Sequence, residues 1–283
     1  MKDAECVAFL QWALPRLKLR WPGFRRVRKQ ACKRIQRRMT ALSCPDVAAY
    51  RLYLDEHPEE WASLDAFCRI TVTRFYRDRR VFQTLMDDVL PELARAALAR
   101  SARTLRVWCA GCGSGEEPYT LAIGWQLQLA RRFPGLVLDI LATDADDDLL
   151  SRASEACYAW SAVRNLPPDW FARAFRLHDE RYCLKPEFRT AVRFRSHDLR
   201  TPLDDGGFDL ICCRNLAFTY FEHDLQLQAA QALHDRLLPG GVLVLGVHER
   251  LPEGGPGFSV ISERLALYRE PRAGCGRAGE DGY

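Results

Sequence analysis

The segment Arg106–Ile123 reads RVWCAGCGSGEEPYTLAI and joins a short apolar run to a helical pattern through three alternate glycines. The apolar run predicts a buried strand, and glycines at this spacing let a loop bring its backbone close to a ligand. The glycines are Gly111, Gly113 and Gly115. Loops of this kind usually hold phosphate at the N-terminus of the following helix. Here Glu116 and Glu117 open that helix, so we expect a different ligand.

Two phosphate-binding interpretations fail on the residues present. A Walker loop needs Gly-Lys-Ser/Thr, where this chain has Gly-Glu-Glu, and a dinucleotide loop has G-x-G-x-x-G, where this chain has G-x-G-x-G. At about 4 Å and an effective dielectric constant of about 20, each carboxylate would repel a phosphate charge by roughly 4 kcal/mol. We expect no nearby arginine to offset that repulsion.

A ligand without phosphate and with a positive group resolves the conflict. S-adenosylmethionine has an adenosine, a sulfonium and an amino-acid end, and a carboxylate can bind its ammonium group. The next predicted strand ends in ATDADDD, which places Asp144 where an acid usually holds a ribose diol. The alternative is structural, because two glutamates at a helix start also suit the helix dipole.

The sequence pattern changes near residue 99 from helical to alternating strand and helix. Residues 4–98 have a helical pattern, broken at Trp21-Pro22-Gly23, Cys44-Pro45-Asp46 and His57-Pro58. Short strand-like runs then alternate with helical segments, which is typical of a doubly wound parallel sheet that binds ligands at the carboxyl ends of its strands. The runs are 105–110, 136–144, 192–199, 208–215 and 241–249.

These patterns predict an α/β chain with a Rossmann-like, doubly wound sheet and an N-terminal all-helical domain. We expect the helical, basic domain to cover residues 1–98, the ligand-binding domain 99–270, and a disordered tail 271–283. Leu237–Gly241, LLPGG, predicts a helix stop and a turn before the last of these strands. Within the extra segment Tyr158–Phe194, the run RYCLKPEFRTAVRF predicts a small appended hairpin.

Composition bears on the compartment of the protein and on whether it contains a membrane span, disulfides or a metal site. No apolar run approaches the ~18–20 residues that cross a bilayer, and we identify no signal peptide. Eleven cysteines, an odd number, are scattered through apolar segments, so we expect reduced thiols in a cytoplasmic protein. Cys109 and Cys112 form a C-x-x-C without a second pair at zinc spacing, and we predict no metal site.

The net charge of +4 hides a basic N-terminal region, in which residues 1–50 carry twelve Lys and Arg against three acids. Most of them lie in Phe24–Met39, where an apolar residue recurs every fourth position, as in an amphipathic helix. The apolar positions are Val27, Ala31, Ile35 and Met39. The basic remainder is either a solvated face or a surface for an acidic partner, which could be a protein, a nucleic acid or an anionic lipid.

From about residue 65 to 270 the chain resembles the CheR family, the S-adenosylmethionine-dependent methyltransferases that esterify glutamates on chemotaxis receptors. The motifs that carry this resemblance are ITVTRFYRD (70–78), GCGSGEEPYTLA (111–122), ATDADDDLLSRA (142–153), HDL (197–199) and FDLICCRN followed by YF (208–221).

The resemblance implies roles for particular residues. Thr71, Thr73 and Arg77 would contact the cofactor from the first motif, Gly111, Gly113 and Gly115 would form its loop, and Glu117 would hold its methionine end. Asp144 would hold the ribose, and Asp198 and Leu199 stand where the family has Asn-Leu beside the adenine. Arg214 and Asn215 would end the fourth strand at the cofactor. Arg77, Arg214 and Tyr220 would be catalytic, with Arg77 or Arg214 orienting the acceptor carboxylate and Tyr220 near the transferred methyl.

Three departures from the family pattern leave alternatives open. RNLAFTYF has four residues between Arg-Asn and Tyr-Phe where the family usually has three, so Thr219 and Phe218 compete with Tyr220 for the place near the methyl group. The family's Gly-His-Ser-Glu is Gly246–Glu249, GVHE, in this chain. The hairpin region is short and lacks the glycine-rich loop of members that dock a receptor tail.

We therefore expect a methyltransferase whose acceptor is a protein glutamate. Alternatives are a small-molecule carboxylate or thiol acceptor, and a non-catalytic regulator that binds the cofactor. The expected partner is an acidic protein that binds the basic helix. We expect no nucleic acid, since the basic helix lacks stacking aromatics, no membrane insertion, and a monomer or weak dimer.

Overall fold

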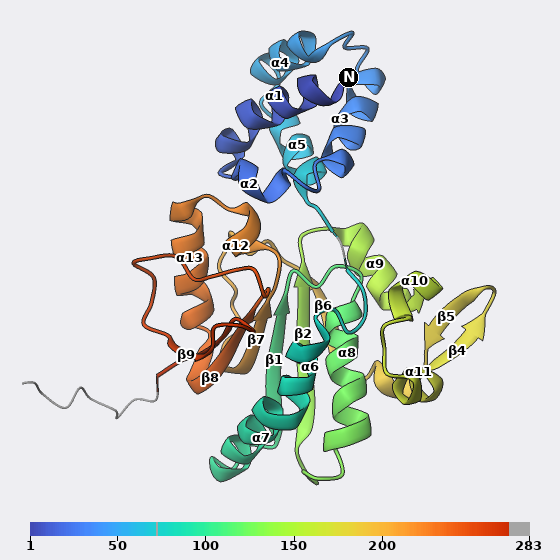
Figure 1. Ribbon diagram of the computed structural model, residues 1–283, viewed down its shortest axis with the longest axis vertical. Coiled ribbons are helices and arrows are strands. Elements are labelled where there is room, and N and C mark those ends of the chain that lie inside the picture. The colour runs from blue at the N-terminus through green and yellow to red at the C-terminus, as the bar shows by residue number, and fades with distance from the viewer. Residues whose placement is uncertain (72, 272–283) are drawn as a thin grey trace, which may run out of the picture. The chain divides into compact units, whose positions relative to one another are not determined.

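The computed structural model describes residues 1–71 and 73–271, which form two compact units (Figure 1). The N-terminal unit comprises Met1–Val72 together with Leu216–Gln226, and the sheet unit comprises Thr73–Asn215 and the chain from Leu227 onward. Residues 73–98, which we assigned to the N-terminal domain, belong to the sheet unit because their apolar side chains enter its core. Those side chains include Leu90, Leu93 and Ala97.

The N-terminal unit is helical, as predicted. Its helices are α1 (Asp3–Ala13), the 3-10 turn η1 (Leu14–Leu17), α2 (Trp21–Phe24), α3 (Lys29–Ala41), α4 (Val47–Glu56), α5 (Glu60–Cys68) and α12 (Ala217–Tyr220), and α13 (His223–His234) begins in it. The predicted break at Asp46 is the start of α4, where its carboxylate accepts a hydrogen bond from the Ala49 N–H at 2.8 Å. The predicted break at Trp21-Pro22-Gly23 is instead the short helix α2, whose first turn tolerates proline.

Helix α3 has the predicted amphipathic character. Its apolar stripe, Ala31, Ile35 and Met39, is buried. The helix begins at Lys29 rather than near Phe24, because Phe24 ends α2 and residues 25–28 form turns.

The main sheet of the sheet unit has seven strands in the order β6-β2-β1-β7-β8-β10-β9. Its strands are β1 (Thr104–Ala110), β2 (Val137–Asp144), β6 (Val192–Ser196), β7 (Phe208–Cys213), β8 (Leu237–Leu245), β9 (Ser259–Ser262) and β10 (Leu267–Arg269). Neighbouring strands from β6 to β8 run parallel, and β10 is antiparallel to both of its neighbours. The chain moves outward from β1 through β2 to β6 and then returns to β7. The β1–β7 boundary is therefore the topological switch point, where such sheets bind ligands.

Helices pack on this sheet. They are α6 (Arg79–Thr84), η2 (Leu85–Val89), α7 (Leu90–Ala99), α8 (Glu116–Gly124), η3 (Trp125–Leu129) and α9 (Asp147–Glu155). Helix α7 packs on β1 and β7, whereas α8 and α9 pack on β2 and β6. Residues 4–98 thus contain two sets of helices with the same helical periodicity. Helices α1 to α5 pack in the N-terminal unit, and α6, η2 and α7 pack in the core of the sheet unit.

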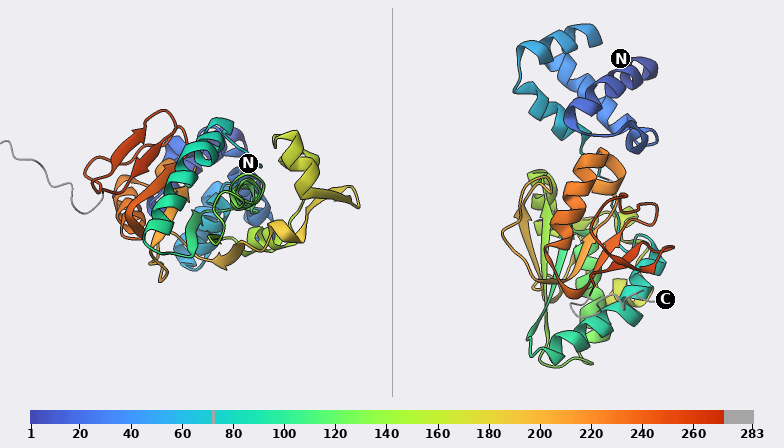
Figure 2. Two further views of the ribbon diagram at one scale, coloured as in Figure 1. Left: turned by 90° about the horizontal axis from the view of Figure 1, so that it is seen from below. Right: turned by 90° about the vertical axis from the view of Figure 1, so that its left-hand side faces the viewer.

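The appended hairpin exists, but its strands differ from the prediction. A second sheet has the order β3-β5-β4, from β3 (Cys157–Tyr158), β4 (Phe175–His178) and β5 (Arg181–Leu184), and lies on the side of the sheet unit away from β9 (Figures 1 and 2). Around it are α10 (Trp160–Val163), α11 (Pro168–Ala174) and the 3-10 turn η4 (Pro186–Phe188). The partner of β5 is β4, which precedes the predicted segment, and Val192–Ser196 joins the main sheet instead.

The predicted turn at Leu237–Gly241 lies inside a strand. Strand β8 already begins at Leu237, and its pairing with β7 shifts between Leu237 and Val242. Gly240 has a φ of 79° in this irregular stretch. The prediction of a turn before the strand is therefore wrong, because these residues form an irregular part of the strand itself.

Two disulfides correct the expectation that all thiols are reduced. Cys6 is bonded to Cys32 in the N-terminal unit, and Cys157 is bonded to Cys183 in the small sheet. The second pair lies directly opposite in the β3–β5 register, which brings the two thiols together.

The predicted tail lies outside the described residues except for Pro271. Among the helices that the structure describes, none has the length and apolar character needed to cross a bilayer.

Candidate functional site

The glycine loop has the predicted place between β1 and α8. Gly111, Gly113 and Gly115 all have positive φ values, of 75°, 56° and 88°. A Cβ on Gly115 would lie 3.0 Å from the Cβ of Ala153, so both the backbone conformation and the space favour glycine there. The loop is tied to β2, because the N–H groups of Gly111 and Cys112 donate to the Thr143 carbonyl at 2.8 and 2.9 Å.

Asp144 ends β2 beside this loop. One of its carboxylate oxygens accepts from the Gly113 N–H at 2.8 Å, and the other accepts from the Asp146 N–H at 3.1 Å. Burial raises the pKa of the Asp144 carboxyl, although these hydrogen bonds oppose the shift. Each carboxylate oxygen has a second lone pair, so Asp144 can shape the loop and still accept from a ligand hydroxyl.

Arg214 corrects the expectation that no arginine lies near the glutamates of the loop. Its guanidinium donates to Glu117 at 2.8 Å and to Asp78 at 2.6 Å, and also to the Arg77 carbonyl at 3.2 Å. The Arg214 side chain is only 4% exposed. Burial opposes its charge, but the two carboxylates raise the pKa of the guanidinium. This trio of side chains carries one net negative charge.

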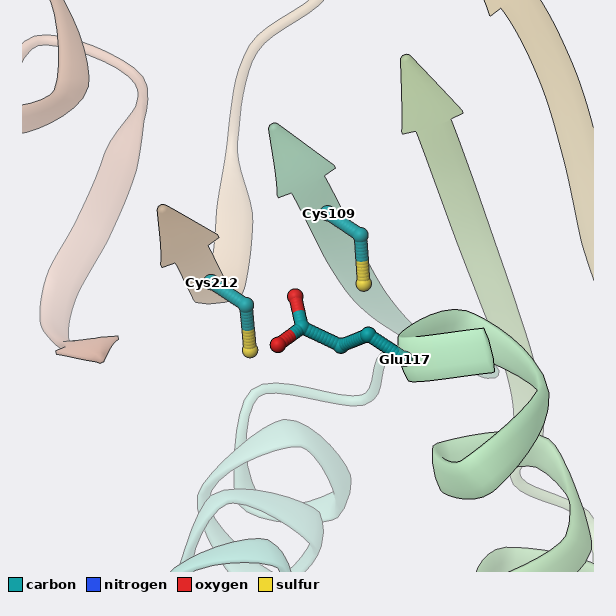
Figure 3. Close-up of side chains that lie close together, drawn as sticks. All are labelled: Cys109, Glu117 and Cys212. Carbon is teal, nitrogen blue, oxygen red and sulfur yellow. The ribbon is translucent and has the colours of Figure 1, made fainter. Parts of the chain in front are cut away.

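The carboxylate of Glu117 also faces two thiols. Figure 3 shows Glu117, in the first turn of α8, pointing toward Cys109 of β1 and Cys212 of β7. One ligand-type atom from each residue lies within 4.8 Å of the others. We assign no metal to this cluster, since Glu117 already binds the Arg214 cation and burial raises the pKa of the Cys109 thiol well above its usual value. The thiols instead form an apolar wall behind the carboxylate.

Glu116, the other loop glutamate, points into a different environment. Its side chain is 4% exposed, and among the described residues its Oε2 atom has no hydrogen-bond partner. Burial raises the pKa of Glu116 to about 7, and a hydrogen bond from the Thr73 side chain opposes this shift. Thr73 is therefore tied to the helix start beside the glycine loop.

Arg77 and Asn215 meet at the carboxyl end of β7. The Arg77 guanidinium donates to the Asn215 side-chain oxygen at 3.1 Å. Asn215 has a left-handed backbone, with φ of 58°, and its N–H donates to Glu249 at 2.6 Å. The same Glu249 oxygen accepts from the Gly246 N–H at 2.7 Å. The buried Glu249 thus joins the ends of β7 and β8 and positions Asn215.

Asp198 and Leu199 follow β6 at the same edge of the sheet. The His197 N–H donates to the Asp144 carbonyl at 3.0 Å, which brings the HDL segment next to the end of β2. The Asp198 carboxylate is held by the Arg200 side chain at 2.6 and 2.9 Å, and Leu199 is buried. The adenine role of these two residues stays a prediction.

The remaining predicted residues belong to the N-terminal unit. Thr71 lies at its end, and Tyr220 lies in α12, where its ring packs edge-on against Phe24 with centroids 5.1 Å apart. Of the alternatives, Phe218 is 2% exposed and forms part of the core, whereas Thr219 and Tyr220 are half-buried. Their roles near the methyl group stay predictions.

Two acids of the site were missed. Asp78 directly follows Arg77 in the sequence, but its partner Arg214 is 136 residues away. Glu249 was noted only as part of the GVHE variant. Each acid could have been noticed from its place in the sequence. Asp78 directly precedes the helix α6, and Glu249 follows the strand β8.

The chain is similar to several known proteins. Residues 71–266 match the family model described as "CheR methyltransferase, SAM binding domain". A chemotaxis protein methyltransferase from Listeria innocua is 40% identical over 182 residues, which are 64% of this chain and 66% of that protein. An uncharacterized 104.1 kDa protein from Rhodobacter capsulatus is 35% identical over 245 residues, which are 86% of this chain and 25% of that protein. The chain thus spans less than two thirds of both relatives.

A solved structure that matches part of the chain is S-adenosylmethionine-bound CalS10, an amino pentose methyltransferase from Micromonospora echinaspora. It is 20% identical, with a TM-score of 0.33, and the match covers 69% of this chain and 66% of that one.

The raised pKa of Glu116 predicts a dependence of stability on pH. Its value in the folded chain, about 7, exceeds the ordinary 4.5, so the folded state binds more protons between these pH values and loses stability as pH rises through them. We expect Glu116→Gln to stabilise the protein by about 2–3 kcal/mol at pH 8 and to have little effect below pH 4.5. Urea unfolding between pH 4 and 8 measures this difference.

Glu253→Gln, at an exposed position, provides the control and should match the native chain at every pH. Parallel stability profiles for Glu116→Gln and the native chain would contradict the burial argument.

Proposed function

The chain belongs to the CheR methyltransferase family, and from this premise we propose that it transfers the methyl group of S-adenosylmethionine to a glutamate carboxylate on a protein acceptor. The observation that carries the proposal is the arrangement at the β1–β7 switch point. Carboxylates surround the glycine loop, and the Arg77–Asn215 pair lies at the end of β7. The carboxylates suit a positively charged cofactor, and the Arg77–Asn215 pair suits an anionic acceptor.

The residues present fit S-adenosylmethionine. The loop backbone has the positive φ values that allow close approach, and the Arg214 trio keeps a net negative charge beside it. In this proposal Glu117 binds the ammonium group and Asp144 binds the ribose hydroxyls. A phosphate-bearing ligand would meet repulsion from the same carboxylates.

When bound, S-adenosylmethionine supplies an electrophilic methyl group on a positively charged sulfur. The glutamate oxygen forms the new bond to that methyl carbon, and the carbon–sulfur bond breaks with its electron pair going to sulfur. A glutamate carboxylate is already anionic, so the protein needs no strong base. Its task is to align the oxygen with the methyl group and to exclude water.

Arg77 is the better candidate for orienting the acceptor carboxylate. Both terminal nitrogens of Arg214 bind carboxylates, and its side chain is almost fully buried. The Arg77 guanidinium donates to the neutral amide oxygen of Asn215, and Arg77 is half-buried. A guanidinium can hold a carboxylate with two parallel hydrogen bonds, and Asn215 would help to fix its direction.

We further propose that α3 docks the acidic acceptor protein. Three arginines of this region are used inside the N-terminal unit: Arg28 binds Asp3, Arg34 binds backbone carbonyls, and Arg38 binds Glu60. Five cations of this region remain exposed, and the basic face consists of four of them, Arg26, Lys29, Lys33 and Arg37; the fifth is Arg25. Cations that do not stabilise the fold are available for a partner.

S-adenosylhomocysteine should bind the sheet unit and raise the melting temperature, because its ammonium and ribose groups suit Glu117 and Asp144. A hundredfold excess over Kd corresponds to about 2.7 kcal/mol of stabilisation. Asp144→Ala should weaken binding by roughly 1–3 kcal/mol through lost hydrogen bonds, as measured by calorimetry. The exposed Asp169→Ala is the control, and stabilisation by NAD alone would exclude the proposed cofactor.

Methyl transfer from labelled S-adenosylmethionine to an acidic protein should give a base-labile label, because a carboxyl methyl ester hydrolyses in base. Arg77→Gln should lower kcat by roughly 10- to 100-fold at saturating cofactor, since the acceptor oxygen loses its alignment. Its affinity for S-adenosylhomocysteine should change far less. A base-stable label on a small molecule would instead support a small-molecule acceptor.

Reversing the charge of Lys29 and Lys33 to Glu should raise KM for a protein acceptor by about 3- to 10-fold at low salt, because exposed charges act mainly on encounter. The effect should fade as salt screens it, and the melting temperature should not change. Lys2→Glu with Lys18→Glu makes the same charge change elsewhere in the unit. Equal effects of both double variants, or none from the first, would leave the basic face as a solvated surface.

A further inference from the structure

A cavity of about 540 Å³ lies in the sheet unit, beside the Arg77–Asn215 pair. The segment that precedes α6 forms one wall, and the ends of β7 and β8 form others. Arg77 and Asn215 line it, so the proposed acceptor carboxylate would enter from this cavity. Its volume lies within the range of about 300–1,000 Å³ that is usual for ligand pockets, and it has room for more than one carboxylate.

The lining of the cavity is predominantly basic. Its lining includes three arginines, Arg74, Arg77 and Arg79, and the exposed His248. The one acid in the lining is Asp78, and its carboxylate already binds Arg214 at 2.6 Å. Arg74 and Arg79 are exposed and have no ion pair or hydrogen-bonded partner among residues 1–71 and 73–271. Two positive charges therefore remain beyond the one that a single acceptor carboxylate needs.

We propose that Arg74 and Arg79 are specificity residues, and that they bind a second carboxylate next to the one that is methylated. This inference rests on the proposed function for the identity of the first carboxylate. Arg77 aligns the reacting oxygen, and Arg74 and Arg79 hold a neighbouring acid that does not react. The substrate class is thus an acceptor with two adjacent acidic groups, from an acidic protein segment or a free dicarboxylate.

The position of the arginines argues against a merely solvated cluster. Arg80 follows Arg79 directly in α6 and is also exposed, yet it does not line the cavity. Arg74 and Arg79 are separated by five positions but line the same cavity. The turn at Tyr76 and Asp78, both with positive φ, bends the chain so that this convergence occurs.

Binding to the full chain saturated with S-adenosylhomocysteine tests the inference without turnover. The probes are two peptides, one with a Glu-Glu pair and one with a Gln-Glu pair, which are identical and uncharged outside the pair, together with free glutarate and butyrate. The native chain should bind each two-carboxylate probe about tenfold more tightly than its one-carboxylate counterpart, because it gains a second charge-assisted contact. The double variant Arg74→Gln with Arg79→Gln should reduce this ratio to about one.

Arg80→Gln is the matched control and should keep the tenfold ratio. Equal affinity of the native chain for one- and two-carboxylate probes overturns the inference, and so does an equal loss in Arg80→Gln and the double variant. The comparison within the native chain does not depend on any variant folding. Tighter binding of the Glu-Glu peptide than of glutarate would assign the second carboxylate to a protein segment, and the reverse order to a small acid. Either order supports a two-carboxylate site.

Methyl-ester formation on the same peptides separates this inference from the proposed function. A two-carboxylate preference in binding, with no ester on any probe, would support the site and overturn glutamate methylation. Esters formed on both peptides with equal KM would support glutamate methylation and overturn the role of Arg74 and Arg79.

Discussion

The buried guanidinium of Arg214 is the interaction on which the site depends. It follows β7 directly and binds Glu117 at the start of α8, Asp78 before α6 and the Arg77 carbonyl. Three segments that are distant in the sequence are thus held at one point. Each of the carboxylates would be costly to bury alone, and removal of one member of such a buried pair typically costs about 3–5 kcal/mol. Because the Arg214 guanidinium also donates to the Arg77 carbonyl, it fixes the backbone of Arg77 beside the site.

The parts of the site that lie within one motif could be predicted from the sequence. The glycine loop and Asp144 follow from a strand, a glycine spacing and an acid at a strand end, which are local features. The contact between Arg214 and Glu117 spans 97 residues and depends on the register of β1 with β7, which pairs Cys109 with Cys212. Arg214 lies two positions beyond that pair, and Glu117 lies just past the loop that follows β1. No local pattern encodes that register, so the sequence predicted an unpaired acidic loop.

Local patterns also do not encode which elements pack together, and this explains the differences between the predicted and the observed fold. Helical periodicity shows that Leu90 and Leu93 face a core, but not which core, so residues 73–98 were grouped with the helices before them. The glycines near Gly240 and the strand residues of Arg181–Leu184 were identified by type, whereas their partners depend on pairing across the sheet. The expectation of reduced thiols rested on the predicted cytoplasmic location, which applies to all cysteines of the chain alike. The two disulfides follow instead from individual positions, such as the direct β3–β5 pairing of Cys157 with Cys183.

The distribution of charge bears on how such a site can accelerate the proposed reaction. Acids gather at the glycine loop and arginines at the neighbouring cavity, so both proposed reactants are bound as ions. In the transfer a sulfonium becomes a neutral thioether and a carboxylate becomes a neutral ester, so both charges disappear. Groups that only stabilise the separate ions would strengthen binding of the reactants more than that of the transition state, and would not raise the rate. The charges are therefore best understood as a means of selection and alignment, and the acceleration must come from holding the carboxylate oxygen in line with the methyl group. Loss of the acceptor's negative charge then weakens its attraction to Arg77, which favours release of the ester.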